Sequence, residues 1–337
     1  MRVGVDVGGT KTDAVAIDET GRILHQLRVS TGFGASSVLQ TTAGVVSSLA
    51  TALQVPIDSI ESVGVGVPGA VDSASGRVSH AVNLGLEELE LGGELSHMLG
   101  LPVRVENDVN AAALGAFHLL GLPRATSMAY LNLGTGLAAG LVLEGRLWRG
   151  ARGTAGEIGH IPVDPDGPVC QCGQRGCLEM VASGSAVSRQ WPSEAASPVH
   201  ALFESALAGE PLAVAVKQRF LANVASAVRI LVLSVDVETV VIGGGISSLG
   251  DPLLEGIRAA LDGWSEHSPF IASLRLSERV RLVPAGTPVS AVGAAFVGAA
   301  SHGAGPRPTP HPQPEPDAQR EPDAQREPDQ RRASTDG

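Results

Sequence analysis

The sequence MRVGVDVGGTKTDAVAID, residues 1–18, sets apolar runs on either side of a glycine turn. Residues 2–7 predict a buried strand, Gly8-Gly9 predicts a turn, and residues 13–18 predict a second strand. A further apolar run at residues 22–29 predicts a third strand. The chain therefore opens as a series of strands joined by tight turns.

A weaker copy of this unit recurs later in the chain. Asn132-Leu-Gly-Thr-Gly136 lies between the apolar runs 127–133 and 137–143, much as Asp6-Val-Gly-Gly-Thr10 lies between its own strands. Two such units in one chain predict two related half-domains that face each other.

The remaining elements follow from the same patterns. Short apolar runs bounded by turn residues predict strands, and longer runs at helical spacing predict helices. The predicted strands are residues 62–67, 101–106, 239–242 and 280–284, and the predicted helices are residues 36–53, 109–120, 212–233 and 290–300. This mixture is typical of an α/β protein.

Composition excludes several classes of function. The chain has 337 residues and a formal net charge of −11, which disfavours nonspecific binding to nucleic acid because such binding needs a basic surface. It shows neither a secretory signal pattern nor an apolar run of about 18 residues, so we expect no membrane span. The three cysteines, an odd number, all lie within residues 170–177, which favours a cytoplasmic protein with reduced thiols.

Residues 303–337 differ from the rest of the chain. Proline alternates with polar residues there, and then Glu-Pro-Asp-Ala-Gln-Arg recurs with small changes. So little apolar side chain predicts a disordered tail, which is either an inert extension or a docking segment.

A metal site is predicted by Cys170, Cys172 and Cys177 together with His160. Three thiolates and one imidazole form the Cys3His set that suits tetrahedral Zn²⁺. Because four protein ligands leave no open position, we expect a structural zinc ion. Three unrelated loop cysteines are the alternative.

Glycine turns provide candidate phosphate sites. In Asp6-Val-Gly8-Gly9-Thr10-Lys11, backbone N–H groups, a hydroxyl and an ammonium group point to phosphate binding, and Asp6 is placed to hold Mg²⁺ through water. Gly134-Thr135-Gly136 supplies a second cradle, and Gly244 in a Gly-Gly-Gly run either lies under an adenine ring or starts a helix. An ordinary hairpin would show the same Gly8-Gly9 pair. Neither a Walker P-loop nor a Rossmann fingerprint is present.

Acidic and amide side chains form a further cluster. Glu106-Asn107-Asp108 falls between a predicted strand and helix, so Asp108 is either a functional carboxylate or the helix N-cap. Glu157 and Glu179 flank the cysteine loop. Each is either an ordinary solvated side chain or one held rigidly by the metal loop.

These motifs together resemble the ROK sugar-kinase family over roughly residues 1–300. The motifs that carry the resemblance are Asp6-Val-Gly-Gly-Thr-Lys11, Glu106-Asn-Asp108, Gly134-Thr-Gly136, Gly156-Glu-Ile-Gly-His160, Cys170-Gln-Cys-Gly-Gln-Arg-Gly-Cys177-Leu-Glu179 and Ile242-Gly-Gly-Gly-Ile246. Two positions depart from the family. Ala138 stands where glycine is common, and Gly85-Leu86 stands where glucose kinases often carry a tryptophan.

The resemblance implies an actin-like ATPase (ribonuclease H-like) fold with two lobes and a cleft between them. Residues 1–110 and about 288–302 would form the small lobe, and residues 111–287, with the zinc loop 157–180, the large lobe. Family members are commonly homodimers or homotetramers.

The resemblance also implies roles for single residues. Asp108 would be the catalytic base, and Asn107, Glu157, His160 and Glu179 would bind sugar hydroxyls. His160 would then serve both zinc and sugar, each through one ring nitrogen.

The implied reaction is transfer of the γ-phosphoryl group from Mg²⁺-ATP to the 6-hydroxyl of glucose. N-acetylglucosamine or N-acetylmannosamine kinase is the alternative. A polyphosphate-dependent kinase ranks lower, because such relatives tend to lack the cysteine cluster. A sugar-responsive transcriptional regulator is disfavoured, because the turn that begins at Asp6 leaves no room for a preceding DNA-binding segment.

Overall fold

The computed structural model describes residues 1–284 and 286–299. Its first sheet has the strand order β3-β2-β1-β4-β8. The strands are β1 (Arg2–Val7), β2 (Lys11–Ile17), β3 (Ile23–Ser30), β4 (Ser62–Val67) and β8 (Val103–Asn107). β2 is antiparallel to both of its neighbours, whereas β1, β4 and β8 run parallel. The carboxyl ends of the three parallel strands therefore meet at one edge of the sheet.

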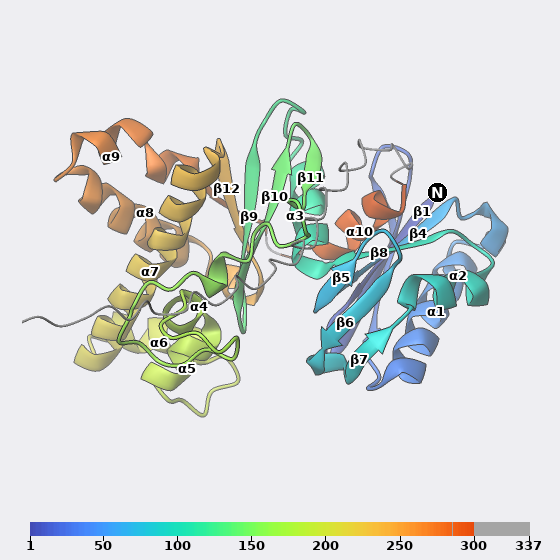
Figure 1. Ribbon diagram of the computed structural model, residues 1–337, viewed down its shortest axis with the longest axis horizontal. Coiled ribbons are helices and arrows are strands. Elements are labelled where there is room, and N and C mark those ends of the chain that lie inside the picture. Colours follow the sequence, from blue (N-terminus) through green and yellow to red (C-terminus); the bar gives the residue numbers. More distant parts are fainter. Residues whose placement is uncertain (285, 300–337) are drawn as a thin grey trace, which may run out of the picture. The chain divides into compact units, whose positions relative to one another are not determined.

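The second sheet repeats this arrangement with the order β11-β10-β9-β12-β13. Its strands are β9 (Met128–Leu133), β10 (Leu137–Leu143), β11 (Arg146–Trp148), β12 (Thr239–Gly243) and β13 (Val280–Leu282). β10 is antiparallel to β9 and β11, and β9, β12 and β13 run parallel. The two sheets thus share one pattern of order and direction, in agreement with the repeated sequence unit. Figure 1 shows β1, β4 and β8 of the first sheet and β9 to β12 of the second.

A third, smaller sheet joins β5 (Ala70–Asp72), β6 (Arg77–Ala81) and β7 (Leu86–Leu89) in antiparallel order. No strand is predicted here from the sequence, because these strands are short and many of their exposed residues are polar. β5 begins directly after Pro68-Gly69, so the small sheet extends from the end of β4.

Helices cover both large sheets. On the first sheet, α1 (Ala35–Ala52) and α2 (Leu91–Leu99) bury apolar side chains such as Val45, Leu49 and Leu95. Each large sheet with the helices that cover it is called a half of the molecule. The second sheet packs against a larger core built around α7 (Pro211–Val235). The other helices of that half are α4 (Glu179–Ala182), α5 (Gly184–Gln190), α6 (Pro198–Leu207), α8 (Asp251–Ser265) and α9 (Pro269–Leu274).

α7 is the one described helix that is long and apolar enough to cross a membrane by length and composition alone. Its buried residues, among them Phe220, Val224 and Leu231, instead belong to the core of the second half. Lys217 and Arg219 also interrupt its apolar surface. The helix therefore gives little support for a membrane span.

Two helices connect the halves. α10 (Val289–Ala299) packs against β1 and β4 of the first sheet and against α3 (Asp108–Leu119), and α3 in turn packs against β10 of the second sheet. The contact is close enough to require glycine at Gly64, because a Cβ there would overlap the carbonyl oxygen of Ala294. Since the described residues pack as one compact unit, the predicted lobe boundaries near residues 110 and 288 stay a prediction.

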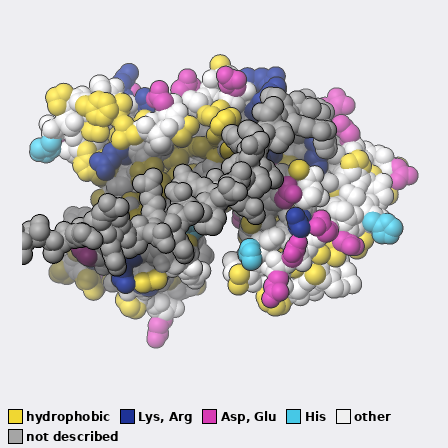
Figure 2. All heavy atoms as spheres, viewed as in Figure 1, with side chains coloured by type: hydrophobic (Ala, Val, Ile, Leu, Met, Phe, Trp, Pro, Cys, Tyr) yellow, Lys and Arg dark blue, Asp and Glu magenta, His cyan; other side chains and the backbone are white. Residues whose placement is uncertain are grey.

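Acidic and basic side chains are interspersed over the described part of the face in Figure 2. The predicted tail, residues 303–337, lies outside the described residues.

Candidate active site

The Glu106-Asn107-Asp108 segment lies where β8 ends and α3 begins. The N-cap of α3 is Asn107, whose Oδ1 accepts hydrogen bonds from the backbone N–H groups of Val109 at 3.0 Å and Asn110 at 3.2 Å. The interpretation of Asp108 as the N-cap is therefore wrong, since Asp108 is the first residue of the helix itself. The Nδ2 of Asn107 also donates to the carbonyl of Gly69 at 3.3 Å, so this amide links α3 to the start of the small sheet.

Asp108 is half-buried at this junction. Burial raises the pKa of its carboxyl group, and the negative charge of Glu157 raises it further. The hydrogen bond from the Val109 N–H, 2.9 Å from Oδ1, opposes this rise. A carboxyl group whose pKa is raised in this way is suited to accept a proton from a substrate.

Asp6 approaches Asp108 across Gly66. A Cβ at Gly66 would lie 3.6 Å from the Asp108 Cα atom and 3.7 Å from Asp6 Oδ1. Burial raises the pKa of Asp6 to about 8, with further contributions from Asp108 and Asp13, while Arg28 lowers it. Two acidic groups at the carboxyl ends of β1 and β8, on either side of β4, thus form a place where a divalent cation would be favoured.

Glu106 is the buried member of the cluster, with only 1% of its surface exposed. Its Oε2 accepts from Arg149 Nε at 2.7 Å and from Ser73 Oγ at 3.1 Å, and its Oε1 accepts from Asn110 Nδ2 at 3.1 Å. Arg149 follows β11, so this ion pair ties the first sheet to the second half. Arg149 is not predicted from the sequence, because nothing local relates it to a carboxylate 43 positions earlier.

A cavity of about 300 Å³ brings predicted residues together from separate parts of the chain. Asn107 comes from the β8–α3 junction, and Glu157 and His160 come from the segment that precedes the cysteine loop. Other lining residues are Gly69, Ala70, Val71, Ser73, Glu106, Val109, Asn110, Ala138, Ala139, Arg149, Arg152, Gly153, Thr154 and Ala155. Of the predicted catalytic and sugar-binding residues, Asp108 and Glu179 lie outside this lining, as do the predicted nucleotide-binding turns and the three cysteines.

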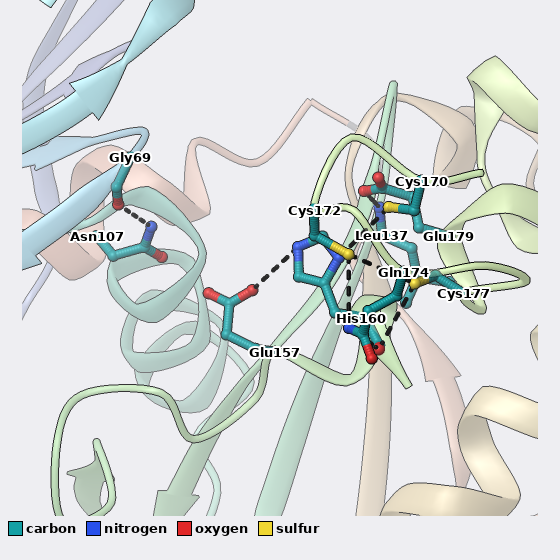
Figure 3. A network of polar contacts seen from close by, with 10 residues as sticks. All are labelled: Gly69, Asn107, Leu137, Glu157, His160, Cys170, Cys172, Gln174, Cys177 and Glu179. Carbon is teal, nitrogen blue, oxygen red and sulfur yellow. Dashed lines mark hydrogen bonds and ion pairs between the residues drawn. The ribbon is translucent and has the colours of Figure 1, made fainter. Parts of the chain in front are cut away.

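The four predicted metal ligands meet in one place (Figure 3). The ligand atoms of His160, Cys170, Cys172 and Cys177 all lie within 4.8 Å of one another. His160 Nδ1 is 3.7 Å from Cys170 Sγ, and Cys172 Sγ is 3.6 Å from Cys177 Sγ. These separations match the roughly 3.8 Å edge of a tetrahedron whose Zn–S bonds are about 2.3 Å long. The donor set therefore fits Zn²⁺.

The thiols support the same interpretation. Hydrogen bonds from the backbone and side chain of Gln174 lower the pKa of Cys172 to about 6, whereas burial and the neighbouring thiols raise that of Cys177 to about 12. Three thiolates this close together repel one another, and a bound divalent cation would remove that conflict.

His160 divides its two ring nitrogens between two environments. Nδ1 faces the thiols, and Nε2 lies 4.0 Å from Glu157 Oε2 on the side of the cavity. Figure 3 shows the ring between the cysteines and Glu157. A metal held at Nδ1 would therefore fix the orientation of Nε2 toward the cavity.

Glu179 is tied to the second glycine turn. Its Oε2 accepts from the backbone N–H of Leu137 at 3.1 Å, and a Cβ at Gly136 would lie 2.5 Å from the same oxygen. Gly134 and Thr135 in this turn accept hydrogen bonds from Gly184 N at 2.9 Å and from Ser185 N at 3.2 Å, at the start of α5. The turn is thus held between Glu179 and α5.

The first glycine turn is more open. Gly9, Thr10 and Lys11 are exposed, and Gly8 N donates to the Lys11 carbonyl at 3.0 Å, which closes a β1–β2 hairpin. Gly244 has a φ of 81° and precedes the short helix Gly245–Leu249, so it does start a helix.

Tyr130, buried on β9, lies between the carboxylates Asp6 and Asp108 and the glycine run 243–245. Burial raises the pKa of its hydroxyl group, and the charges of Asp6 and Asp108 add to that rise. The same hydroxyl lies where a Cβ at Gly243 would fall, next to Gly244. The carboxylates of the first half therefore lie within electrostatic reach of the glycine run of the second.

Comparison with known proteins agrees with these features. A family model described as the ROK family matches residues 2–297. A glucokinase of Halalkalibacterium halodurans is 32% identical over 78% of this chain and 86% of its own, and an N-acetylmannosamine kinase of Vibrio cholerae is 34% identical over 77% and 88%. The crystal structure of a Streptomyces griseus ROK glucokinase with glucose and AMPPNP has a TM-score of 0.72 and 31% identity, covering 88% of this chain and 99% of its own.

These neighbours have the actin-like ATPase fold, so the predicted fold class is confirmed.

Proposed function

The chain belongs to the ROK family, and on that premise we propose that it is an ATP-dependent sugar kinase. The proposed reaction transfers the γ-phosphoryl group of ATP to the 6-hydroxyl of glucose. The observation that carries the proposal is the cavity of about 300 Å³ in which Asn107, Glu157 and His160 meet. Asn107 directly precedes Asp108 in the sequence.

Asp108 is the proposed general base. It would accept the proton of the attacking hydroxyl as the bond between that oxygen and the γ-phosphorus forms. The bond from the γ-phosphorus to the β–γ bridging oxygen would break, and its electron pair would leave with ADP. The raised pKa of Asp108 suits this role, because a base with a higher pKa accepts a proton more readily once it is ionised. Such proton transfer contributes about 10²–10⁴-fold to the rate.

Nucleotide binding is proposed for the two glycine turns. Phosphoryl transfer depends on positioning and on neutralising charge. The exposed Gly8-Gly9-Thr10-Lys11 turn offers N–H groups, a hydroxyl and an ammonium group, and Gly134-Thr135-Gly136 with Gly244 would complete the cradle. Asp6 would hold Mg²⁺ that accompanies ATP, which requires its carboxyl group to lose its proton.

The sugar hydroxyls are assigned to Asn107, Glu157, His160 and Glu179. His160 and Glu157 offer Nε2 and Oε2 beside the cavity, whereas Glu179 contacts Leu137 and would reach the sugar only from the edge of the second glycine turn. We propose that Zn²⁺ bound by Cys170, Cys172, Cys177 and His160 supplies a rigid anchor for these side chains and takes no part in the chemical step.

Glucose is the preferred acceptor in this proposal, since several similar relatives are named glucokinase and the similar Streptomyces griseus structure is a complex with glucose. N-acetylmannosamine is the second candidate, because a kinase for it has a comparable 34% identity. An ADP-release assay with glucose, mannose, fructose, N-acetylglucosamine and N-acetylmannosamine separates the two. If none of these sugars causes release of ADP, the kinase proposal is rejected.

The role of Asp108 is tested by Asp108→Asn. We expect kcat to fall by about 10²–10⁴-fold, because the amide cannot accept the proton, while the calorimetric Kd for sugar stays within a few-fold of the wild-type value. Asp18→Asn is the control, since Asp18 lies at an exposed turn where its Oδ1 accepts from Thr20. Full turnover in Asp108→Asn would remove the residue from this role.

A further inference from the structure

A second cavity, of about 790 Å³, lies in the second half of the molecule and shares no lining residue with the candidate active site. Its walls come from the cysteine loop, α4, α5 and α7. The lining residues are Val163, Asp164, Pro168, Met180, Val181, Arg189, Gln190, Arg219, Asn223, Ser226, Arg229 and Ile230. A cavity of this size accommodates a small metabolite.

The cavity is positively charged in a protein whose net charge is −11. Arg189, Arg219 and Arg229 line it, against one carboxylate, Asp164. Within residues 1–284 and 286–299, none of the three arginines forms an ion pair. Three unneutralised guanidinium groups around one cavity favour an anion there.

Two of these arginines are held in place by neighbouring groups. Arg189 Nη2 donates to the Met180 carbonyl at 3.1 Å, and the Arg229 guanidinium lies over the Trp264 ring, 4.3 Å from its centroid. Arg219 is exposed, and within the described part of the chain it has no such anchor. Among residues 1–284 and 286–299, each guanidinium keeps N–H groups without a partner, in the planar fork geometry that matches phosphate oxygens.

We propose that this cavity binds a phosphate-bearing small molecule. Asn223, Gln190 and Ser226 supply polar groups for the rest of such a ligand. A second copy of the chain fits less well, because a two-fold contact centred on the cavity would bring its arginines against their own equivalents.

The position of the cavity gives it a regulatory use. Met180 and Val181 directly follow Glu179, and Val163 and Asp164 lie shortly after His160. A ligand in the cavity would therefore touch both segments that carry proposed sugar-binding residues. This coupling rests on the proposed function, whereas the binding site itself does not.

Trp264 provides a local reporter for the test, because it lies directly beneath Arg229. The chain contains three tryptophans, so the full-length Trp148→Phe, Trp191→Phe variant retains Trp264 alone. Inorganic phosphate and glucose 6-phosphate are titrated separately, with glucose as the uncharged comparison. We expect a saturable change in Trp264 emission with the two phosphates and none with glucose.

Substitutions at Arg219 assign the signal to the cavity. Arg219→Gln in the reporter background is expected to weaken phosphate binding at least 10-fold, and Arg219→Lys less, because lysine keeps the charge without the fork. Arg281→Gln removes the same charge from an exposed position on β13 and is expected to leave binding unchanged. Without phosphate, Arg219→Gln should keep the wild-type kcat.

The outcomes separate the possibilities. Tighter binding of glucose 6-phosphate than of phosphate supports a sugar phosphate as the ligand, and equal binding supports recognition of the phosphate group alone. No saturable signal, an equal loss in Arg281→Gln, or a changed sedimentation coefficient in Arg219→Gln without a change in binding would overturn the proposal. If sugar kinase activity is absent but the Trp264 titration saturates, the anion site stands and only its coupling to the sugar fails.

Discussion

The acidic side chains around the β8–α3 junction differ in the charges that surround them. Glu106 is buried against the guanidinium of Arg149, whereas Asp108 forms no ion pair among the described residues. Asp108 instead has Glu157 as a neighbouring negative charge. One carboxylate is thus held in place by a cation, and the next is held in a setting that favours taking up a proton.

Glu157→Gln tests the electrostatic coupling to Asp108. The negative charge of Glu157 raises the pKa of Asp108, so its removal should let Asp108 ionise at lower pH. Because the base is active only when ionised, the acidic limb of the kcat/KM profile should move to lower pH, even though the maximal kcat/KM falls. The measurement is kcat/KM from pH 4 to pH 9.

A charge-matched control is Glu144→Gln, at the tip of the β10–β11 hairpin. It removes one negative charge far from the junction in sequence, and the acidic limb should stay where it is. An unshifted limb in Glu157→Gln would show that Glu157 does not influence the base.

Glu106→Ala tests the buried ion pair. The change leaves Arg149, Ser73 and Asn110 without their shared acceptor, and losing one partner of a buried pair costs about 3–5 kcal/mol. Since the Arg149 side chain is 41% exposed, we expect the lower end of that range, about 3 kcal/mol.

The measurement is the free energy of unfolding in urea. Arg77→Gln is the comparison, because the Arg77–Glu88 pair is exposed and such pairs contribute about 1 kcal/mol or less. Similar losses of unfolding free energy in the two variants would mean that burial does not strengthen the contribution of the Glu106–Arg149 pair to stability.

At the scale of elements, local patterns predicted the two large sheets well. β4 spans the predicted residues 62–67, and α7 exceeds its predicted range by three residues in all. The small sheet escaped prediction, because β5 and β7 have three and four residues and alternate weakly. The His/Cys cluster was predictable from the sequence because three of its four residues lie within eight positions.

Two features of the site required the folded chain. Arg149 meets Glu106 only because β11 and β8 come together in space, and no sequence period connects them. The choice of Asn107 over Asp108 as N-cap depends on one residue of helix register, which composition does not determine. Sequence patterns thus located the segments, and tertiary packing fixed the partners.

The cysteine loop is the element with the sharpest consequence for binding. If Zn²⁺ holds His160 Nδ1, then removing the metal frees the ring and the Glu157 next to it. We expect chelation, or Cys172→Ser, to raise the sugar KM about 10-fold or more, in line with other residues that orient a metal site.

The zinc content is measured by atomic absorption alongside KM. Adding Zn²⁺ back should restore the sugar KM of the chelated protein but not that of Cys172→Ser. An unchanged sugar KM in protein shown to be free of metal would contradict the proposed anchoring role.

At the scale of the whole molecule, α10 is the element on which both halves depend. It buries Val292 and Ala295 against β2 and packs along β1, β4 and α3. The pairs Gly64 with Ala294, and Gly115 with Val289, bring backbones so close that no side chain fits between them. Removal of α10 would therefore expose apolar surface on the first sheet and on α3.

Two truncations test this dependence. Deletion of residues 303–337 should leave kcat, KM and the melting temperature unchanged, because that segment contains too few apolar side chains to contribute to a core. Deletion of residues 289–337 removes α10 as well, and the exposed strands β1 and β4 should then make the protein insoluble or unfolded, as judged by circular dichroism and gel filtration. A folded 289–337 deletion would show that the first sheet is stable without α10. A changed kcat in the shorter deletion would instead favour a docking role for the tail.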